Sequence, residues 1–220
     1  MPNDYWPLAD LQLRTKRLTL LVPTGAQLLE VAAVGARGVH RPGEHPFLTP
    51  WTELPAEQRA RHVLQQHWSR VGAWSPQRWA LEFAVYRQDV PLGMAVLKAA
   101  DFAVTREVKT ESWLGLEHHG QGYGTEARSA LLHLTFTGLG AEYALTEVFR
   151  NNAASQAVSK KLGYRKDGIS RDPLHGQAVI SDRLRLAAAD LAAVDAPAAS
   201  IHGLVQCLPF FLGPQDPASA

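Results

Sequence analysis

The chain has 220 residues, of which 46% are hydrophobic, enough for one well-cored domain of helices and strands, or for such a domain plus a tail. Lys and Arg number 22 and Asp and Glu number 21, so the formal net charge is only +1. This balance argues against a general nucleic-acid binder and against a protein that adsorbs to membrane surfaces. No apolar run approaches the roughly 18 residues that a membrane-spanning helix needs.

The sequence also indicates a compartment. Residues 1–6 lack the basic and apolar stretches of a signal peptide. Cys207 is the single cysteine, so an internal disulfide is excluded and a reducing cytoplasm is expected. We expect Cys207 to be an ordinary apolar residue. The nine His residues show no metal-ligand spacing, so no metal site is expected.

Four elements are predicted in the N-terminal part. Residues 17–22 alternate and predict a strand, and Thr24 can cap the helix that follows it. Residues 35–55 hold several Gly and Pro and predict a loop, either simply exposed or shaping a binding site. Residues 56–74 carry apolar side chains at the helical period. His67 lies on that apolar face, and we expect a hydrogen-bonded core residue rather than a catalytic one.

A β-hairpin comes next. Residues 79–86 and 92–97 predict two strands, with a polar turn over residues 87–91. Residues 108–116 predict a third antiparallel strand, which leads directly into a glycine-rich loop.

The loop opens into a helix predicted over residues 125–137, with Gly138 and Gly140 as its stop. Residues 143–149 predict the next strand. This strand should be parallel to the one at 108–116, because a helix crosses between them.

Asn151 or Asn152 can cap a second helix, which runs to Leu162. Residues 177–187 alternate as a last strand. We therefore expect one domain over residues 1–187.

A C-terminal tail is expected over residues 188–220, where the composition shifts to Ala, Asp and Pro. Residues 187–194 predict a short helix. Residues 201–212 are apolar but fragmented by Gly and Pro, without regular structure. So many large apolar side chains should be ordered, packed either on the same domain or on a partner subunit in a homodimer.

The glycine-rich loop carries the clearest chemical signal. Gly120, Gly122 and Gly124 stand at alternate positions between a strand and a helix. Without a Cβ, the backbone can approach a bulky ligand closely. The first N–H groups of the following helix lack internal partners and favour an anion. A tight structural turn would use the same glycines, but we expect a phosphate-bearing ligand here.

The spacing narrows the choice of ligand. A Walker loop needs Gly-Lys-Ser/Thr, and no Lys follows these glycines. Residues 122–127 fit the dinucleotide pattern G-x-G-x-x-A, and Glu142 lies at the expected distance of about 20 residues. That motif normally opens a βαβ array, however, whereas here it follows an antiparallel meander. A nucleotide-dependent oxidoreductase is therefore an alternative rather than the leading hypothesis.

Three motifs in order resemble one superfamily. His119-Gly-Gln-Gly-Tyr-Gly124 resembles the acyl-CoA pyrophosphate loop of the GCN5-related N-acetyltransferases (GNAT), Gln/Arg-x-x-Gly-x-Gly/Ala. Asn152-Ala-Ala-Ser155, followed by a helix and Leu-Gly-Tyr164, resembles the closing segment of that superfamily. Leu13-Arg-Thr-Lys-Arg-Leu18 is similar to the opening strand of its RimJ/RimL-type branch. His119 departs from the pattern, since a neutral imidazole donates more weakly to a phosphate than Gln or Arg does.

This resemblance implies an α/β fold with a mixed, mostly antiparallel central sheet, a splayed pair of parallel strands, and flanking helices. It also implies acetyl-CoA as co-substrate, without a metal. The residues that would bind acetyl-CoA are then Trp113, Leu114, Gly115, Leu116, His119, Gly120, Gln121, Gly122, Tyr123, Gly124, Thr125, Asn152 and Ser155.

The implied reaction is the direct attack of a neutral primary amine on the thioester within one ternary complex. Ser155 is the candidate donor of a proton to the leaving thiolate, because the helix dipole favours negative charge there. Glu111 is the candidate base, on the same strand face as Trp113 by alternation. Glu117 and the adjacent His118 and His119 are further candidates, and a chain of waters could replace a side-chain base.

The leading hypothesis is thus an N-acetyltransferase that acts on a protein N-terminus, an antibiotic or another small amine. A non-catalytic acyl-CoA-binding regulatory module stays open beside the oxidoreductase. The acceptor cannot be named, because residues 35–55 contain no charge run that would select one.

Overall fold

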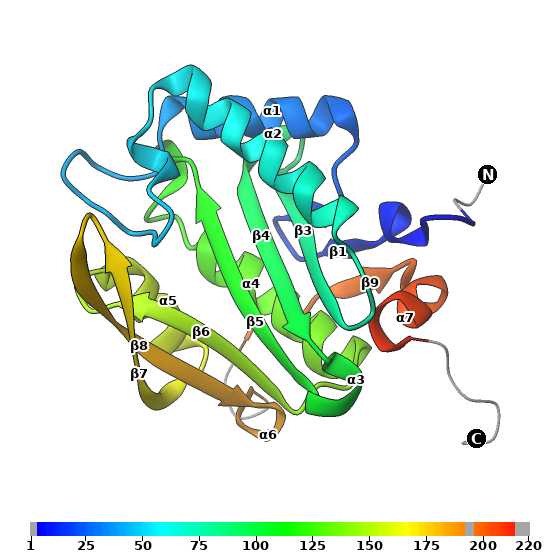
Figure 1. The fold of residues 1–220 in the computed structure, drawn as a ribbon. Helices are drawn as coiled ribbons and strands as arrows, with labels where there is room; N and C mark the ends of the chain where they lie inside the picture. Colours follow the sequence, from blue (N-terminus) through cyan, green and yellow to red (C-terminus); the bar gives the residue numbers. More distant parts are fainter. Residues whose placement is uncertain (1–3, 192–195, 214–220) are drawn as a thin grey trace.

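The computed structural model describes residues 4–191 and 196–213 and contains one mixed sheet that runs through the molecule (Figure 1). The strand order is β7-β8-β6-β5-β4-β3-β2-β1-β9. Neighbouring strands pair antiparallel except β5 and β6, which pair parallel. This is the mixed, mostly antiparallel α/β architecture that the sequence predicted.

The strands are β1 (Gln12–Arg14), β2 (Thr19–Leu21), β3 (Arg78–Arg87), β4 (Val90–Ala100), β5 (Glu107–Leu114), β6 (Tyr143–Phe149), β7 (Arg165–Leu174), β8 (Gln177–Ala187) and β9 (Ser200–His202). The helices are α1 (Gly25–Arg37), α2 (Ala56–Gly72), α3 (Phe102–Thr105), α4 (Tyr123–His133), α5 (Ala153–Lys161), α6 (Ala188–Leu191) and α7 (Leu204–Leu212). Short 3₁₀ turns occupy Pro7–Asp10, Trp51–Glu53 and Leu116–His118, and a π-helical turn at Leu134–Gly138 extends α4.

The sheet separates two layers of helices, and both of its faces are buried at β3 and β4 (Figure 1). Alternate residues of these strands enter different clusters, as the period of two requires. The cluster on the α4 face includes Phe83, Val85, Ala95 and Leu97. The cluster under α1 and α2 includes Ala84, Tyr86, Met94 and Val96.

Several predicted elements are confirmed. β6 and β8 have the predicted bounds, 143–149 and 177–187. Thr24 caps α1 in a capping box with Gln27. Cys207 is fully buried, and burial raises the pKa of its thiol to about 11.

The predicted loop at 35–55 begins too early, because α1 continues to Arg37. Gly35 is a packing residue of this helix rather than a loop residue. A Cβ there would lie 3.2 Å from Cγ2 of Val63 in α2, so glycine lets the two helices approach closely.

The predicted turn of the β-hairpin, residues 87–91, was too long. Only Gln88 and Asp89 separate β3 from β4, so residues 90 and 91 belong to a strand. Pro91 is accepted in β4 because it lies near the start of the strand, before Gly93, where the pairing with β5 begins, so the ladder does not need its missing N–H.

β7 was not predicted from the sequence. This strand lies at the outer edge of the sheet, next to β8. Its side chains are mostly polar and solvent-exposed, and Gly168 and Pro173 interrupt it. Such a strand carries no apolar alternation that a sequence pattern could detect.

The sequence suggested that the apolar tail has no regular structure, but the tail forms a strand and a helix. Residues 200–202 form β9, which pairs with β1 of the same sheet, and α7 follows despite Pro209 inside it. Nε1 of Trp74 donates to the carbonyl of Phe210, at 3.1 Å. Phe211 is fully buried, with its ring centroid 4.9 Å from that of Trp79. The homodimer contact stays a prediction, and residues 192–194 of the predicted short helix lie outside the described residues.

No helix in the described ranges combines the length and the apolar character that membrane spanning requires.

Phe211→Ala should lower the free energy of unfolding by about 3–5 kcal/mol, because it removes a buried ring and leaves a cavity. Val205, on the same helix, is 75% exposed, so Val205→Ala is the matched control and should change stability by less than about 0.5 kcal/mol. Urea unfolding of both variants provides the measurement. Equal midpoints would contradict the packing of α7 on this core.

Candidate functional site

The parallel pair β5 and β6 separates along its length. The last backbone partners in their register are Lys109 and Leu145, although both strands continue for several residues (Figure 1). At this point two threonine hydroxyls replace the backbone N–H groups as hydrogen-bond donors to the carbonyls. Oγ1 of Thr146 donates to the carbonyl of Thr110 at 3.2 Å, and Oγ1 of Thr110 donates to the carbonyl of Leu145 at 3.4 Å. We call the place where these residues meet the branch point.

The backbone of β5 beyond the branch point faces the opening between the strands. The carbonyl of Thr110 already points toward β6, as its bond to Thr146 shows. Because backbone groups alternate between the two sides of a strand, the polar groups of Ser112 and Leu114 point the same way. The ladder between β5 and β6 ends before these residues, so β6 offers their backbone groups no partner. This edge of β5 can therefore bind an extended ligand that carries amide groups.

Of the predicted binding residues at the end of the strand, 113–116, several already use their backbone N–H groups in hydrogen bonds within the protein. The N–H of Gly115 donates to the carbonyl of Leu92 at 2.8 Å, and that of Leu116 donates to the carbonyl of Gly38 at 3.0 Å. Trp113 pairs with Met94 of β4. Only Leu114 of the four residues turns its N–H toward the opening, and Ser112, which the sequence analysis missed, joins it.

His119 is tied to the strand end. Its Nε2 lies 3.0 Å from the carbonyl oxygen of Leu114, so this nitrogen carries the proton and donates to the strand. The ring therefore fixes the entry of the glycine loop, and only Nδ1 is left for another partner.

The loop ends at an uncapped helix N-terminus. Gly122 is the N-cap of α4 at φ +80°, a conformation that favours glycine, and within the described chain no side chain caps this end. The first intrahelical bond is that from the N–H of Glu126 to the carbonyl of Gly122. The N–H groups of Tyr123, Gly124 and Thr125 thus precede any helical partner, and a helix end of this kind favours an anion.

Arg17 holds this loop in place, a role that the sequence analysis missed. Its Nη1 donates to the carbonyl of Gln121 at 3.1 Å, and its Nε donates to Glu126 at 2.6 Å. The guanidinium also covers the ring of Tyr123, at 4.7 Å from the centroid. Burial alone would raise the pKa of Glu126, but hydrogen bonds from Thr15 and Arg17 outweigh it and lower that pKa. The Arg in the opening motif was the available signal.

The glycines leave room that the protein itself does not use. A Cβ at Gly124 would find its nearest atom, Cδ1 of Leu114, only at 3.9 Å, and one at Gly120 would meet nothing within 4 Å. Gly124 has no unusual φ. Its lack of a side chain is therefore not required by the folded chain, and it fits a bulky group against the helix end.

The second helix also begins at this end of the parallel pair. Asn152 caps α5, since its Oδ1 accepts from the N–H of Ser155 at 3.0 Å. The amide NH₂ of Asn152 remains as a donor for another group. Ser155 is half-buried in the first turn. Nη1 of buried Arg128 in α4 donates to Oγ of Ser159 at 3.0 Å, which ties the two helices together.

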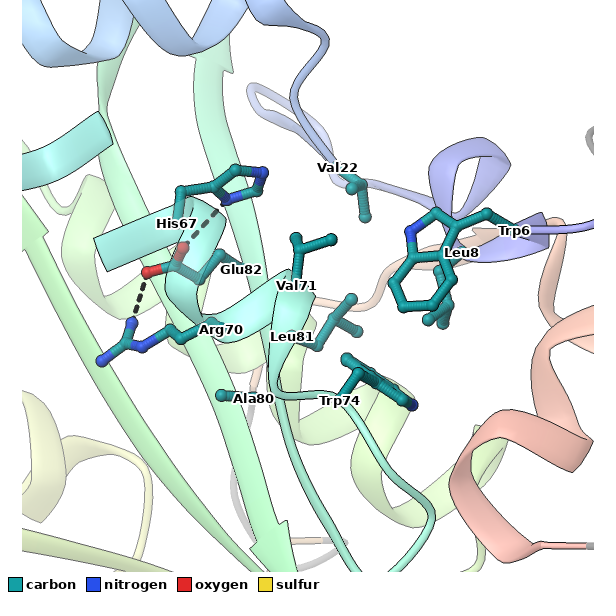
Figure 2. A pocket seen from close by; sticks show the side chains of 10 residues that line it. All are labelled: Trp6, Leu8, Val22, His67, Arg70, Val71, Trp74, Ala80, Leu81 and Glu82. Atoms are coloured by element: carbon teal, nitrogen blue, oxygen red, sulfur yellow. Dashed lines mark hydrogen bonds and ion pairs between the residues drawn. The ribbon is translucent and has the colours of Figure 1, made fainter. Parts of the chain in front are cut away.

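On the opposite face, Glu111 belongs to a charged network under α2. It is ion-paired with Lys98, and its Oε2 lies 3.7 Å from Nη2 of Arg70. Arg70 also pairs with Glu82, whose other oxygen contacts Nδ1 of His67 at 2.9 Å (Figure 2). His67 is 7% exposed, so the prediction of a hydrogen-bonded core residue is confirmed.

Two cavities flank this network. The one in Figure 2 has a volume of about 10 Å³, which holds at most about one water molecule. The other has about 620 Å³ and is large enough for a small substrate. It lies under the C-terminal half of α2. Its lining includes Arg70, Lys98, Lys109 and Leu145, so it reaches the branch point from the α2 face.

Glu117 is directed away from the opening. It accepts from Nε of Arg37 at 3.1 Å, which joins the turn after β5 to the end of α1. His118 lies 3.7 Å from the same carboxylate oxygen. Both side chains therefore lie with α1 rather than with the branch point.

Comparison with known proteins identifies the family and the fold. Residues 17–165, more than half of the chain, match the family model of the acetyltransferase (GNAT) domain. Several solved acetyltransferase structures share the fold. One from Vibrio cholerae, provisionally named a ribosomal-protein-serine acetyltransferase, has 19% identity and a TM-score of 0.62 over 81% of this chain and 98% of that chain.

Two other similar structures contain coenzyme A or its acetyl ester. RimL, a ribosomal L7/L12 α-N-protein acetyltransferase in complex with coenzyme A, has 15% identity and a TM-score of 0.60, over 79% of this chain and 95% of that one. The microcin C7 self-immunity acetyltransferase MccE, in complex with acetyl-CoA and AMP, has 14% identity and a TM-score of 0.60, over 78% and 93%. At such identities the likeness is one of fold.

Proposed function

Because the chain belongs to the GNAT acetyltransferase family, we propose that it transfers the acetyl group of acetyl-CoA to a primary amine by direct attack in a ternary complex. Within that family we place it in the RimJ/RimL-type branch, whose opening motif its N-terminal strands resemble. The observation that carries the proposal is the branch point, with the uncapped N-terminus of α4 at the open end of the parallel pair.

Each part of acetyl-CoA has a complementary element. The pyrophosphate fits the N–H groups of Tyr123, Gly124 and Thr125, where the helix dipole adds favourable charge. The pantetheine amides fit the edge of β5 at Ser112 and Leu114. Bound there, acetyl-CoA supplies an activated acyl group with a thiolate as leaving group.

The acceptor amine fits the other face. The cavity of about 620 Å³ reaches the branch point beside Lys109 and Leu145, so an amine in it could approach the thioester from the side opposite α4. Such placement supplies much of the rate of a ternary-complex reaction, because it converts a bimolecular step into an oriented one. Both positively charged side chains and a carboxylate line this cavity, so its charge does not select one acceptor. The proposed acceptor classes are protein N-termini and small amines.

An acceptor screen scored by release of the CoA thiol tests this function. Turnover with a primary amine supports it. Saturable acetyl-CoA binding without turnover for any amine would favour the non-catalytic acyl-CoA-binding module. An absorbance change with a nicotinamide cofactor would favour the oxidoreductase. A homodimer and a cytoplasmic location remain expectations from the sequence.

Gly124→Val should weaken acetyl-CoA binding by several kcal/mol, because its side chain occupies the space of the pyrophosphate and obstructs the N–H groups. A Cβ at this position lies no closer than 3.9 Å to another part of the chain, so the protein should stay folded. Gly25→Val is the matched control, since Gly25 also lies in the first turn of a helix with nothing within 4 Å of its Cβ position. Calorimetry with equal affinities for both variants would refute the pyrophosphate assignment.

Ser155→Ala should lower kcat by about 10- to 1000-fold with little change in acetyl-CoA affinity, because the hydroxyl acts on the developing thiolate, mainly in the transition state. Steady-state kinetics with the best acceptor and calorimetry with acetyl-CoA provide the two readings. An unchanged kcat would exclude Ser155 from the chemical step.

Glu111→Gln should remove the acidic limb of the pH–rate profile, since a general base must be ionised to accept a proton. A purely structural carboxylate, held by Lys98 and Arg70, would instead alter stability and leave the shape of the profile intact. The pH dependence of kcat/KM decides between the two. Full rate with the wild-type profile would exclude Glu111 as the base and leave water or Nδ1 of His119 for that role.

A further inference from the structure

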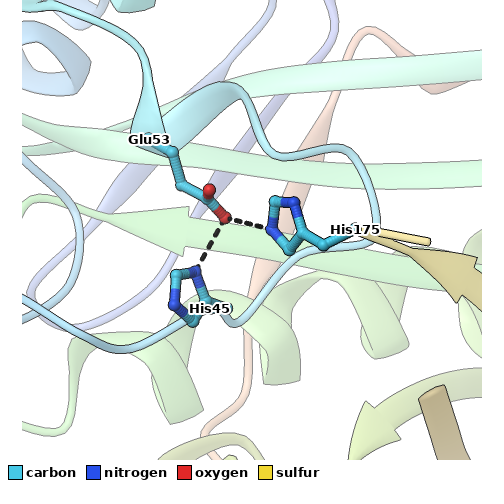
Figure 3. A group of neighbouring side chains, drawn as sticks. All are labelled: His45, Glu53 and His175. Carbon is cyan, nitrogen blue, oxygen red and sulfur yellow. Dashed lines mark hydrogen bonds and ion pairs between the residues drawn. The ribbon is translucent and has the colours of Figure 1, made fainter. Parts of the chain in front are cut away.

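Two segments far apart in the sequence meet at a cluster of potential metal ligands. His45 and Glu53 lie in the connection between α1 and α2, and His175 lies at the tip of the β7–β8 hairpin (Figure 3). Oε1 of Glu53 lies 2.8 Å from Nδ1 of His45 and 3.1 Å from Nε2 of His175. One ligand atom from each residue falls within 4.8 Å of the others.

We propose that His45, Glu53 and His175 bind a divalent transition metal, with Zn²⁺ as the best match, and that the metal fastens the α1–α2 connection to the hairpin. Two imidazole nitrogens and one carboxylate form a donor set that zinc uses, with metal–ligand distances of roughly 2.0–2.2 Å. A tetrahedral site with those distances separates its ligand atoms by roughly 3.3 Å. The N–O distances present, 2.8 and 3.1 Å, need to open by only a few tenths of an ångström.

The imidazoles are oriented for this role. Their ring centroids lie 5.7 Å apart at an interplanar angle of 74°, so the rings meet edge to face and one nitrogen of each turns toward Glu53 (Figure 3). His45 would bind through Nδ1 and His175 through Nε2, each with its proton on the other nitrogen. The two imidazole side chains are about half exposed, at 49% and 51%, so a metal ion can enter and a water can complete its coordination.

Glu53 and His175 are supplied by two different kinds of turn. Glu53 ends a 3₁₀ turn whose other residues, Trp51 and Thr52, are buried. His175 and Gly176 form the two-residue turn of the hairpin, with φ of +51° and +73°. Asn, Asp and Gly are the usual residues in such turns, and His is also enriched at positive φ, so the turn can carry an imidazole at the tip of the hairpin.

The proposal differs from the expectation, based on sequence, of no metal site. That expectation rested on spacing along the chain, and His175 lies 122 residues from Glu53. The fold, rather than a local motif, brings the ligands together. Because the metal would join the α1–α2 connection to the β7–β8 hairpin, it would hold two segments that flank the open side of β5 and β6 (Figure 1). The site does not depend on acetyl transfer.

Calorimetric titration of the full chain with Zn²⁺, after treatment with a chelator, tests the proposal. We expect one saturable site per chain. His175→Asn keeps a residue that suits the turn, and His45→Gln keeps a polar side chain. Loss of a residue that only hydrogen-bonds to a metal ligand lowers metal affinity by roughly 10- to 100-fold. Each of these variants loses a ligand itself, so its zinc affinity should fall by more than that. Co²⁺ should give the visible absorption bands of a tetrahedral site in the wild type and lose them in both variants.

His202→Gln is the matched control, because His202 is an exposed imidazole on β9, at the opposite edge of the sheet. This variant should bind zinc as the wild type does. No saturable binding by the wild type, equal affinity in His175→Asn, or an equal loss in His202→Gln would each overturn the site. Acetyl-CoA affinity, measured on the same samples, reports on the proposed function separately, so a failure of one leaves the other intact.

Discussion

The end of pairing between β5 and β6 is the constraint on which the rest of the site depends. A buried parallel ladder normally continues as long as both strands do, since an unpaired backbone group inside a protein is costly. Here the hydroxyls of Thr110 and Thr146 satisfy carbonyls at the point where the ladder stops. Beyond that point the backbone of β5 offers its polar groups to a ligand, and the glycine loop and α4 begin at the same end.

The sheet also divides the work between its two faces. On the α4 face lie helix N-termini and small residues, which suit phosphates and a thioester. On the α2 face lie ionisable side chains and a cavity of about 620 Å³, which suit an amine and its proton transfer. At the branch point the edge of β5 is no longer paired with β6, so a group bound on one face of the sheet can be reached from the other face. A mainly antiparallel sheet with a single parallel pair provides this opening without loss of its core.

Local patterns predicted those parts of the protein whose determinants are close in sequence. The alternation of residues 143–149 and the glycines at 120–124 each reflect a rule that acts within a few residues. β7 could not be found, since its polar residues follow from its place at the edge. Likewise, the opening motif contains Arg17 but does not show which distant loop this residue holds, and no spacing rule unites His45 with His175. These relations exist only once the chain has folded.

The most direct test of the central claim is an experimental structure of the protein in complex with CoA. The account predicts the pyrophosphate within hydrogen-bond distance of the N–H groups of Tyr123, Gly124 and Thr125. It also predicts the pantetheine amides against Ser112 and Leu114, in the opening between β5 and β6. CoA bound elsewhere, such as in the cavity under α2, with that opening unfilled, would contradict the account.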